Sequence, residues 1–293
     1  MNQEYDISII TVNYNGIKDT MELIDSIPFD EYSLEVIVVD NASSQDEASI
    51  IENKYPKVKV LRSKINLGFA GGNNLGIKAA KAKYIFFVNN DTYFKDFNIN
   101  ALILRLQSST YIGVVCPKIR FSDNGQHIQY AGYTKLSGIT IRNKSIGYDE
   151  PDNGQYDIAH PTYYAHGAAM MVKREVIEHI GMMPEEFFLY YEEIDWSIRI
   201  RNAGYKIWYE PACTIFHKES KSTGRNSPTR AYYLTHNRFL LVKRNYKGIN
   251  KFISYLYLII ASSTDSLLNL IRGHNDLSKS IMSGIITFLK IGS

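Results

Sequence analysis

The sequence contains too few cysteines for a small disulfide-rich protein or a structural zinc site. Its two cysteines, Cys116 and Cys213, cannot form a disulfide framework and supply too few thiolates for a zinc ribbon. Such sparse use of cysteine is typical of proteins in a reducing compartment. The N-terminus also lacks a basic segment followed by a long apolar run, so no secretory signal is expected. Both absences predict a cytoplasmic protein.

The sequence also lacks a strong charge imbalance and a long hydrophobic run. Its 293 residues include 33 Lys and Arg and 30 Asp and Glu, which give a formal net charge of +3. That balance argues against a protein whose main ligand is nucleic acid. The longest uncharged, mostly apolar stretch is residues 252–264. It is shorter than the roughly 20 residues of a spanning helix, so no transmembrane segment is predicted.

The first hundred residues alternate short apolar runs with segments of helical periodicity. The apolar runs are residues 7–12, 34–39, 58–61 and 84–88. This alternation is typical of parallel strands joined by crossover helices, and almost wholly apolar strands are those buried on both faces of a sheet. With 45% hydrophobic residues, the chain can also bury a sizeable core. The sequence therefore predicts an α/β fold.

The pattern is weaker between residues 110 and 160, where Gly, Asn and Asp predict only short strands and a loop. Regular patterns return after residue 160. The elements expected there are a strand over 167–172, a helix over 174–179, a helix over 192–202, a strand over 206–209 and a helix over 232–246. Gly204 is placed to end the second of these helices.

Polar turns follow the four predicted strands. They are residues 11–16, 40–44, 66–73 and 89–92. In an open α/β sheet, ligands bind beyond the carboxyl ends of the strands. The first turn contains neither the dinucleotide pattern G-x-G-x-x-G nor the Walker pattern G-x-x-x-x-G-K-[ST], which argues against an NAD enzyme or a P-loop NTPase.

Two acids close the second and fourth predicted strands. Asp40 could accept hydrogen bonds from the N–H of a base or from a ribose hydroxyl, although turns favour Asp-Asn in any protein. Asp91, in the segment Asn89-Asn90-Asp91, could hold a divalent cation that bridges a diphosphate, because magnesium and manganese prefer oxygen ligands with open water positions. The alternative for Asp91 is an ordinary helix N-cap.

A cluster of acids, Glu192, Glu193 and Asp195, begins one of the predicted helices. In a buried site their mutual repulsion would raise the pKa of at least one of them toward that of a general base. The alternative is a surface helix, because acids at any helix N-terminus complement the helix dipole.

A histidine and several cations follow the last predicted strand. His217 is the histidine, and Lys218, Lys221 and Arg225 lie in the Ser- and Gly-containing loop after it. This composition suits a loop that surrounds phosphate oxygens once a ligand has bound. An isolated histidine, however, is usually structural.

These features occur together in an order that resembles one known family. The chain resembles the family-2 glycosyltransferases, inverting enzymes of the GT-A fold, and in particular their bacterial rhamnosyltransferase-like branch. The resemblance covers roughly residues 6–245 and rests on the four turns, the strand that starts at Gly167, the acidic cluster and His217. It implies a mixed GT-A sheet flanked by helices.

The resemblance implies a donor site and a metal site. Asp40 would contact the nucleotide base. Asp91, the last residue of the family's D-x-D position, and His217 would bind a divalent metal, manganese or magnesium. Asn89 stands where a strict D-x-D has its first acid, so a weaker metal affinity is expected. The other residues of the nucleotide and donor pocket would be Thr11, Asn13, Asn66, Gly71 and Asn90.

The resemblance also implies a catalytic base and a reaction. Glu193 occupies the position of the family's base, which is usually an Asp, so its carboxylate reaches one methylene further and Glu192 and Asp195 remain alternatives. The chain would move a sugar, rhamnose or another hexose, from a nucleoside-diphosphate sugar to a hydroxyl of a glycan or lipid-linked acceptor in cell-surface polysaccharide synthesis. Two other functions stay open: a sugar nucleotidyltransferase, and a nucleotide-sugar-binding protein without turnover.

Residues 246–293 predict a helical tail after a catalytic domain of residues 1–245. Apolar residues recur at helical spacing through this tail. The basic residues at its start are Lys243, Arg244, Lys247 and Lys251. Basic residues beside an apolar helix face are typical of a helix in the interface of an anionic bilayer. We therefore expect contact with the inner face of the plasma membrane; a hairpin packed on the catalytic domain and a homodimer interface are the alternatives.

Overall fold

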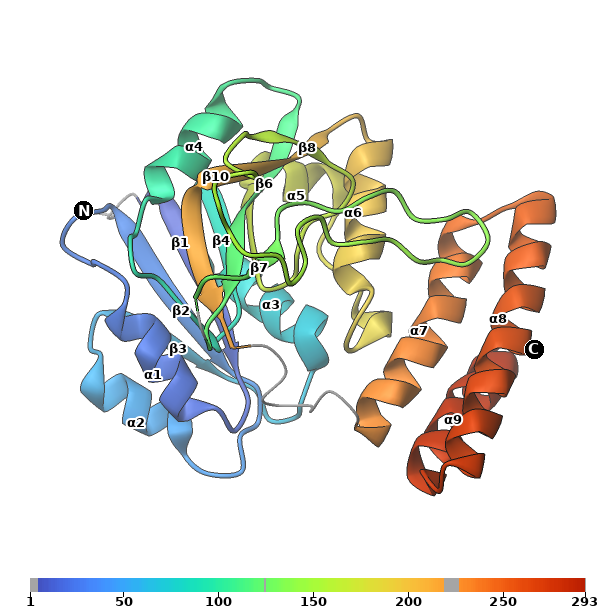
Figure 1. Ribbon diagram of the computed structural model, residues 1–293. Coiled ribbons are helices and arrows are strands. Elements are labelled where there is room, and N and C mark those ends of the chain that lie inside the picture. Colours follow the sequence, from blue (N-terminus) through green and yellow to red (C-terminus); the bar gives the residue numbers. More distant parts are fainter. Residues whose placement is uncertain (1–4, 124, 219–226, 293) are drawn as a thin grey trace.

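The computed structural model of this chain describes residues 5–123, 125–218 and 227–292. In these ranges ten strands form one mixed sheet with helices packed against it (Figure 1). The strands are β1 (Ile7–Asn13), β2 (Leu34–Asp40), β3 (Val58–Arg62), β4 (Tyr84–Val88), β5 (Thr92–Tyr93), β6 (Ile112–Phe121), β7 (Ile128–Tyr130), β8 (His160–Thr162), β9 (Ala169–Lys173) and β10 (Lys206–His217). The helices are α1 (Ile17–Asp25), α2 (Glu47–Lys54), α3 (Gly68–Ala79), α4 (Ile99–Gln107), α5 (Arg174–Ile180), the short 3-10 helix η1 (Glu185–Phe187), α6 (Glu192–Asn202), α7 (Pro228–Asn245), α8 (Gly248–Ile271) and α9 (Asn275–Gly292).

The first four strands make a parallel half-sheet in the order β3-β2-β1-β4. Each coincides with a predicted apolar run to within one residue at either end. β1 pairs in parallel with β2 on one side and with β4 on the other, so the strand order reverses beside β1. Such a switch point leaves room for a ligand at the carboxyl ends of the strands. The expected α/β architecture is confirmed.

Helix α3 packs closely on β1 because two of its glycines face the strand. A Cβ at Gly76 would lie 2.4 Å from Cγ2 of Ile10, and a Cβ at Gly72 would lie 2.9 Å from Cγ1 of Val12. A larger residue at either position would push the helix away from the sheet. The close approach holds the first residue of α3, Gly68, beside the turn that follows β2.

Strand β6 is longer than the sequence predicted. The weak pattern between residues 110 and 160 indicated only short strands, but β6 has ten residues, nine of them buried, beside β9 and β10. Lys118 and Arg120 break its apolar pattern, yet both pair with Asp152, and Lys118 is only 3% exposed. The partner acid is distant in sequence, so the local pattern could not reveal this strand. β9, antiparallel to β4 and β6, makes the sheet mixed.

The helices α7, α8 and α9 form a bundle at one side of the sheet (Figure 1). α9 packs against both α7 and α8. A Cβ at Gly284 of α9 would lie 2.9 Å from the carbonyl oxygen of Tyr232, so α7 and α9 approach closely. Phe239 and Phe288 lie in the apolar core of the bundle together with Leu136 from the segment after β7. This shared core fixes the bundle to the rest of the protein.

The tail predicted after residue 245 consists of α8, with 24 residues, and α9, with 18. No helix in the described parts of the chain combines the length and the apolarity of a bilayer-spanning segment. The sequence placed α7 in the catalytic domain, and this helix contacts α6 there as well as α8 and α9. α7 therefore connects the tail to the element that carries the acidic cluster.

Candidate active site

Asp40, at the carboxyl end of β2, is held by neutral hydrogen-bond donors. The Asn13 amide, at the end of β1, donates to Asp40 Oδ1 at 2.9 Å, and the Ser43 hydroxyl donates to the same atom at 2.6 Å. Among the described residues, Asp40 Oδ2 receives only a long contact of 3.4 Å from the Ser43 backbone N–H. This second oxygen can therefore accept a hydrogen bond from a base or a ribose hydroxyl.

A chain of hydrogen bonds joins Asp40 to the end of β4. The Thr20 hydroxyl donates to Asn13 Oδ1 at 2.7 Å, and the Asn90 amide donates to the Thr20 hydroxyl at 3.1 Å. Asn13 also donates to Glu47 Oε2 at 2.8 Å and has no exposed surface. Asn13 is thus the buried connection between Asp40 and Asn90. Thr20 and Glu47 were not predicted as site residues; Thr20 lies on α1 and Glu47 is the first residue of α2.

Three predicted donor-site residues lie in the framework of the site. Thr11 has no exposed surface, and its hydroxyl has no hydrogen-bond partner within the described residues. Gly71 is buried in α3, where a Cβ would lie 2.7 Å from Cβ of Leu67. Asn66 Oδ1 accepts a hydrogen bond from the Asn41 amide at 3.0 Å and so closes the turn before α3. Thr11 and Gly71 both lie beneath the surface, and their direct contacts with the donor stay predictions.

The loop after β4 and the end of β10 bring Asp91 and His217 together. β5 pairs with the end of β10, and Thr92 lies opposite His217 in this pairing. His217 Nε2 lies 3.1 Å from Asp91 Oδ1, and its other ring nitrogen, Nδ1, lies 2.8 Å from Gln129 Oε1 on β7. With Nδ1–H donating to Gln129, His217 directs Nε2 at the Asp91 carboxylate.

This pair has the donor set of a divalent metal site. A carboxylate oxygen and an imidazole nitrogen both bind manganese or magnesium, and a ligating histidine usually donates its second ring N–H to an acceptor such as Gln129 here. No cluster of three or more His, Cys, Asp or Glu residues that could hold a metal occurs in the described ranges. Asp91 and His217 therefore fit an ion that takes its remaining ligands from a bound substrate and water.

The electrostatics of Asp91 favour its charged form. Burial alone would raise the pKa of Asp91, but the hydrogen bond and the charge of His217 outweigh burial and hold this pKa below its ordinary value. The backbone N–H of Lys218 also donates to the Asp91 carbonyl at 3.0 Å. Asp91 is thus ionised at neutral pH and held in place for a cation.

Of the three cations expected to surround phosphate, the structure describes Lys218. Its ammonium pairs with Asp19 at 2.5 Å and with Glu22, both on α1. Burial works against the charge, but the two carboxylates raise the pKa of Lys218 above its ordinary value. Lys218 therefore ties the end of β10 to α1. Lys221 and Arg225 lie outside the described residues.

The segment before β9 connects Asp91 and His217, the metal pair, to the acidic cluster. The ring of His166 lies 6.4 Å, between centroids, from the ring of His217. The next residue, Gly167, adjoins the cluster, since a Cβ there would lie 3.9 Å from Cγ of Glu193. The structure thus brings Glu193 to the same end of the sheet as His217 and its partner Asp91.

His166 is a site residue that the sequence analysis missed. Burial and the charge of His217 lower the pKa of His166 to about 3, so its ring is neutral near pH 7. Its Nδ1 accepts the backbone N–H of Ala168 at 3.1 Å, and its ring stacks on Tyr133 with centroids 5.7 Å apart. These contacts fix the uncharged ring of His166 beside the metal pair. Its only local signal was its position one residue before Gly167.

Among the three candidate bases, Glu193 is the least buried. Glu192 is 4% exposed and Asp195 is 1% exposed, whereas Glu193 is partly exposed. Burial raises the pKa of Glu193 to about 7, and its Oε2 has no hydrogen-bond partner among the described residues. Burial and the charge of Glu193 raise the pKa of Glu192 well above its ordinary value. With a pKa of about 7, Glu193 can exchange a proton near neutral pH.

Asp195 is engaged by α7 and has a structural role. Arg244 Nε donates to Asp195 Oδ1 at 3.0 Å, and the Asn245 amide donates to the same oxygen at 2.7 Å. Arg199 Nε lies 3.5 Å from the other oxygen. These contacts join α6 to α7 and engage both oxygens of Asp195.

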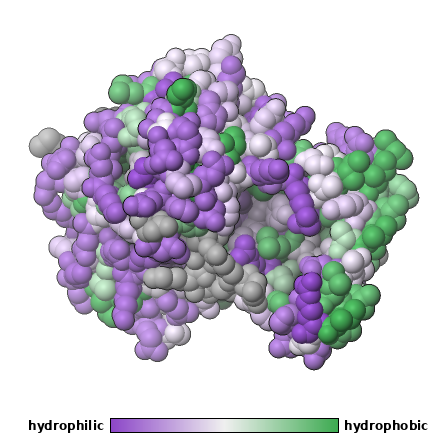
Figure 2. Space-filling view, in the orientation of Figure 1, coloured by the Kyte–Doolittle hydropathy of each residue, from purple (hydrophilic) through white to green (hydrophobic). Residues whose placement is uncertain are grey.

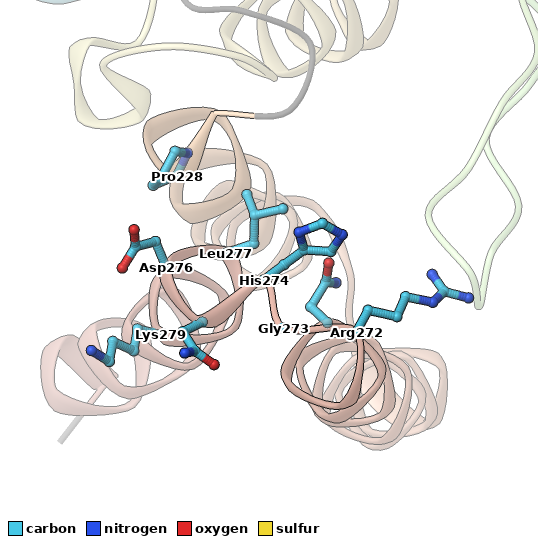
Figure 3. Close-up of a pocket in the computed structure, with 9 residues that line it drawn as sticks. Pro228, Arg272, Gly273, His274, Asp276, Leu277 and Lys279 are labelled. Atoms are coloured by element: carbon cyan, nitrogen blue, oxygen red, sulfur yellow. The ribbon is translucent and has the colours of Figure 1, made fainter.

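Two cavities lie away from these residues. One, of about 750 Å³, lies between the start of α7 and the turn from α8 to α9 (Figure 3). Arg272 and Lys279 line it but point to opposite sides. The other, of about 390 Å³, is lined by charged residues that include the paired Lys118 and Asp152. The basic residues that line the second cavity pair with acids of the same cavity.

Comparison with known proteins agrees with this geometry. The model of the Glycosyl transferase family 2 matches residues 8–181. The chain is 30% identical over 240 residues to the low-salt glycan biosynthesis hexosyltransferase Agl10 of Haloferax volcanii, covering 80% of this chain and 75% of that protein. It is 27% identical over 255 residues to the dTDP-rhamnosyl transferase RfbF of Shigella flexneri, with coverages of 82% and 81%. It is 24% identical over 217 residues to the N-acetylglucosaminyl-diphospho-decaprenol L-rhamnosyltransferase of Mycobacterium tuberculosis, with coverages of 67% and 70%.

Solved structures share the fold. The mannosyltransferase PcManGT from Pyrobaculum calidifontis, in complex with GDP-Man and Mn²⁺, has a TM-score of 0.61 at 16% identity, covering 98% of this chain and 88% of that one. GalNAc-T7 with UDP, GalNAc and Mn²⁺ has a TM-score of 0.62 at 16% identity, covering 81% and 48%. The expected GT-A fold is confirmed. On its fold and on the family match over most of the sheet, the chain belongs to glycosyltransferase family 2.

Proposed function

We propose that this glycosyltransferase moves a hexose, with rhamnose as the first candidate, from a nucleoside-diphosphate sugar to a hydroxyl group of a glycan or lipid-linked acceptor. The observation that carries the proposal is the partly exposed Glu193, whose pKa burial raises to about 7, at the same end of the sheet as Asp91 and His217. A carboxylate with this pKa can take a proton from a hydroxyl group near neutral pH.

The proposed reaction is a single displacement that inverts the anomeric carbon. The acceptor oxygen forms its bond to the anomeric carbon while the Glu193 carboxylate takes the hydroxyl proton. The bond from that carbon to the diphosphate oxygen breaks, and its electron pair leaves with the nucleoside diphosphate. Burial and the charge of Glu193 raise the pKa of Glu192, which disfavours a second negative charge beside the base.

Other residues would bind and orient the donor. Asp40 Oδ2 would accept a hydrogen bond from the base or the ribose, with Asn13 and Asn90 holding the pocket in shape. Asp91 and His217 would hold a divalent metal, which when bound stabilises negative charge on the departing diphosphate. The presence of Mn²⁺ in the two structural neighbours supports this expectation.

The relatives support the choice of sugar and acceptor. One is named a dTDP-rhamnosyl transferase and another a hexosyltransferase of glycan biosynthesis. The mycobacterial relative carries a diphospho-decaprenol acceptor in its name. These names favour a rhamnosyl or other hexosyl donor, a lipid-linked saccharide acceptor and a role in cell-surface polysaccharide synthesis.

The two alternative functions have less support. A sugar nucleotidyltransferase would need a basic, Gly-rich first turn for a triphosphate, and Tyr14-Asn15-Gly16-Ile17 has no basic residue. A binding protein without turnover would gain nothing from Glu193, because a buried carboxylate with a raised pKa and an unpartnered oxygen weakens the fold.

A donor panel tests the proposed function. The purified protein is incubated with dTDP-rhamnose, UDP-hexoses and GDP-mannose, a polyprenyl-diphosphate saccharide acceptor, and manganese, magnesium or EDTA. Nucleoside diphosphate release is expected to be at least about tenfold faster with metal than with EDTA, and NMR of the product should show an inverted anomer. Donor binding without release under any condition would favour the binding protein, and pyrophosphate formed from a nucleoside triphosphate would favour the nucleotidyltransferase.

We further propose that α8 and α9 place the enzyme on an anionic membrane surface. Residues 246–293 contain five Lys and Arg and two Asp, so their net charge of +3 equals that of the whole chain. Figure 2 shows apolar side chains gathered on the outer side of the bundle. The exposed apolar residues of the two helices are Ile249, Phe252, Ile253, Leu256, Ile259, Ile260, Leu267, Leu268, Leu270, Ile271, Met282, Ile286 and Leu289. An apolar face with a surplus of positive charge suits anionic lipid.

Vesicle co-sedimentation tests this surface. The triple variant Phe252→Glu, Leu256→Glu, Ile260→Glu replaces side chains that are 65%, 51% and 59% exposed, so the fold should tolerate it. Binding to vesicles containing phosphatidylglycerol is expected to fall at least about tenfold, since each lost side chain contributes roughly 1.5–3 kcal/mol when buried. The matched control Leu104→Glu, 66% exposed on α4, should bind like the wild type. If the wild type does not bind vesicles and the triple variant changes only from a dimer to a monomer, the partner of this apolar face is a second copy of the chain and not a membrane.

A further inference from the structure

The turn that leads into the acidic cluster has strained backbone geometry. Phe188, Tyr190 and Tyr191 have φ values of +58°, +71° and +74°, which residues other than glycine rarely adopt. At Phe188 the ψ angle is −56°, and the Leu189 N–H donates to the Phe187 carbonyl at 2.6 Å. This is the rarer, strained form of the γ-turn. Such a turn persists only where its surroundings hold it.

Asn237, on α7, reaches this turn from the side. Its amide nitrogen lies 2.6 Å from the carbonyl oxygen of Phe187, 2.7 Å from that of Leu189 and 2.9 Å from that of Tyr190. Its own Oδ1 lies 2.9 Å from His236 Nδ1, which turns the nitrogen toward the carbonyls. Asn237 has no exposed surface, so water does not satisfy these groups in its place. One amide group, with two N–H donors, thus lies within hydrogen-bond distance of three carbonyl oxygens.

The other side of the turn packs on the donor half of the site. The Phe69 N–H donates to the Phe188 carbonyl at 2.7 Å, and a Cβ at Gly68 would lie 2.2 Å from that oxygen. Tyr233 of α7 stacks on Phe188 with ring centroids 5.0 Å apart. The turn is therefore held between α7 and α3, which begins at Gly68. The chain leads from this turn directly into α6, which carries Glu193.

We infer that Asn237 is a positioning residue for sugar transfer. Its amide holds the turn of residues 187–191 in its strained form, and the turn sets where the Glu193 carboxylate lies relative to the metal pair. The inference rests on the proposed role of Glu193 as the base. It assigns to α7, a helix shared with the C-terminal bundle, a direct part in the geometry of the site.

Two substitutions separate hydrogen bonding from packing. Asn237→Asp keeps the shape of the side chain but removes both N–H donors and places a carboxylate against three carbonyl oxygens. Asn237→Ala leaves a small cavity and adds no charge. If the amide positions the turn, both variants should lower kcat about 100-fold with donor Kd changed less than about threefold, and Asp should be at least as damaging as Ala. A packing role predicts the reverse order, with Asp near wild type, and would overturn the inference.

A control variant accounts for general destabilisation. Ser266→Ala removes a buried hydrogen bond between α8 and α9, in which the Ser266 hydroxyl lies 3.1 Å from the Ser278 carbonyl oxygen. It weakens the same bundle without touching the turn, so kcat should stay within about twofold of the wild type. If Asn237→Asp does not fold, Asn237→Ala, which introduces no charge, is sufficient for the test. Equal losses of kcat in Asn237→Ala and Ser266→Ala would reject a specific role of Asn237.

Two further readouts separate this inference from the proposed function. Hydrogen exchange of the amides of residues 187–191 should quicken at least about tenfold in Asn237→Ala and remain unchanged in Ser266→Ala, whether or not the protein transfers sugar. In an active enzyme, the acid limb of the kcat/KM profile should move to lower pH in Asn237→Ala, because water reaching Glu193 lowers its pKa toward the ordinary value. A wild type without turnover but with the exchange difference would reject the proposed function alone, and unchanged exchange would reject the role of Asn237.

Discussion

Replacing Glu193 with glutamine is expected to lower the rate of sugar transfer by about 10³-fold while donor affinity changes less than about threefold. The amide keeps the size of the side chain but cannot take the proton of the acceptor hydroxyl. Steady-state release of nucleoside diphosphate gives the rate, and calorimetric titration gives the affinity for the donor. Because the base acts in its ionised form and its pKa is about 7, the wild-type rate should rise with pH through neutrality.

The matched control for this prediction is Glu192→Gln. Glu192 is buried and its pKa is raised well above the ordinary value, which disfavours its charged form, so its amide should cost less than about tenfold in rate. A Glu193→Gln enzyme that turns over as fast as the wild type would remove Glu193 as the base. The opposite ranking of the two variants would move the role to Glu192.

The stability of Glu193→Gln provides an independent check that the variant is folded. Folding raises the pKa of Glu193 from 4.5 to about 7, so the folded chain holds this proton more tightly than the unfolded chain. The stabilisation is complete below about pH 4.5 and is lost as the pH rises through 7. Above pH 7 the buried charge opposes folding, and the glutamine variant should then be more stable by up to about 2–3 kcal/mol. Denaturant unfolding at pH 5 and pH 8 measures the difference.

Asp91→Asn should show the second large effect, a loss of about 10²–10³-fold in metal-dependent turnover. Asp91 is ionised and lies 3.1 Å from His217 Nε2, so the amide removes a negative ligand while keeping the shape of the loop. Stabilisation of a departing phosphate group by a metal is worth several kcal/mol, and each 1.36 kcal/mol is a tenfold change in rate. The measurement is nucleoside diphosphate release as manganese is titrated, with manganese binding followed by electron paramagnetic resonance.

A nearby acid provides the control for Asp91. Asp19 pairs with Lys218 at 2.5 Å, so Asp19→Asn also removes a carboxylate close to the end of β10. Asp19→Asn should keep its manganese response within about threefold, because it perturbs an ion pair and not the metal ligand. A normal manganese response in Asp91→Asn would rule out Asp91 as the metal ligand, and wild-type turnover in EDTA would rule out the metal itself.

Much of the fold could be predicted because its signals are local. The first four strands are apolar runs of the right length, and the turns after them carry Asp40, Asn66 and Asp91 at strand ends. Parallel strands bring such turns to one edge of the sheet, so the edge that carries the candidate site was predictable as well. β6 was not, because its interior charges are neutralised by Asp152, far away in the sequence.

The residues that complete the site were hidden for the same reason. Gln129 fixes the ring of His217, His166 lies between that ring and Gly167, and Asn237 holds the turn before Glu193. The site residues that these three side chains contact lie between 47 and 88 positions away along the chain. A histidine, a glutamine and an asparagine are common residue types, and nothing in their neighbours along the chain marks them.

The three acids of the cluster show what the sequence predicts and what only the tertiary structure determines. The amino-acid order alone specified an α/β sheet, a helix starting at the acidic cluster and a carboxylate close to position 193. It could not choose among Glu192, Glu193 and Asp195, because all three lie within one turn of the same helix. Packing distinguishes the three: α7 engages Asp195, burial raises the pKa of Glu192 well above its ordinary value, and Glu193 alone of them is partly exposed. Exposure and charge state depend on contacts between distant segments, and those exist only once the chain has folded.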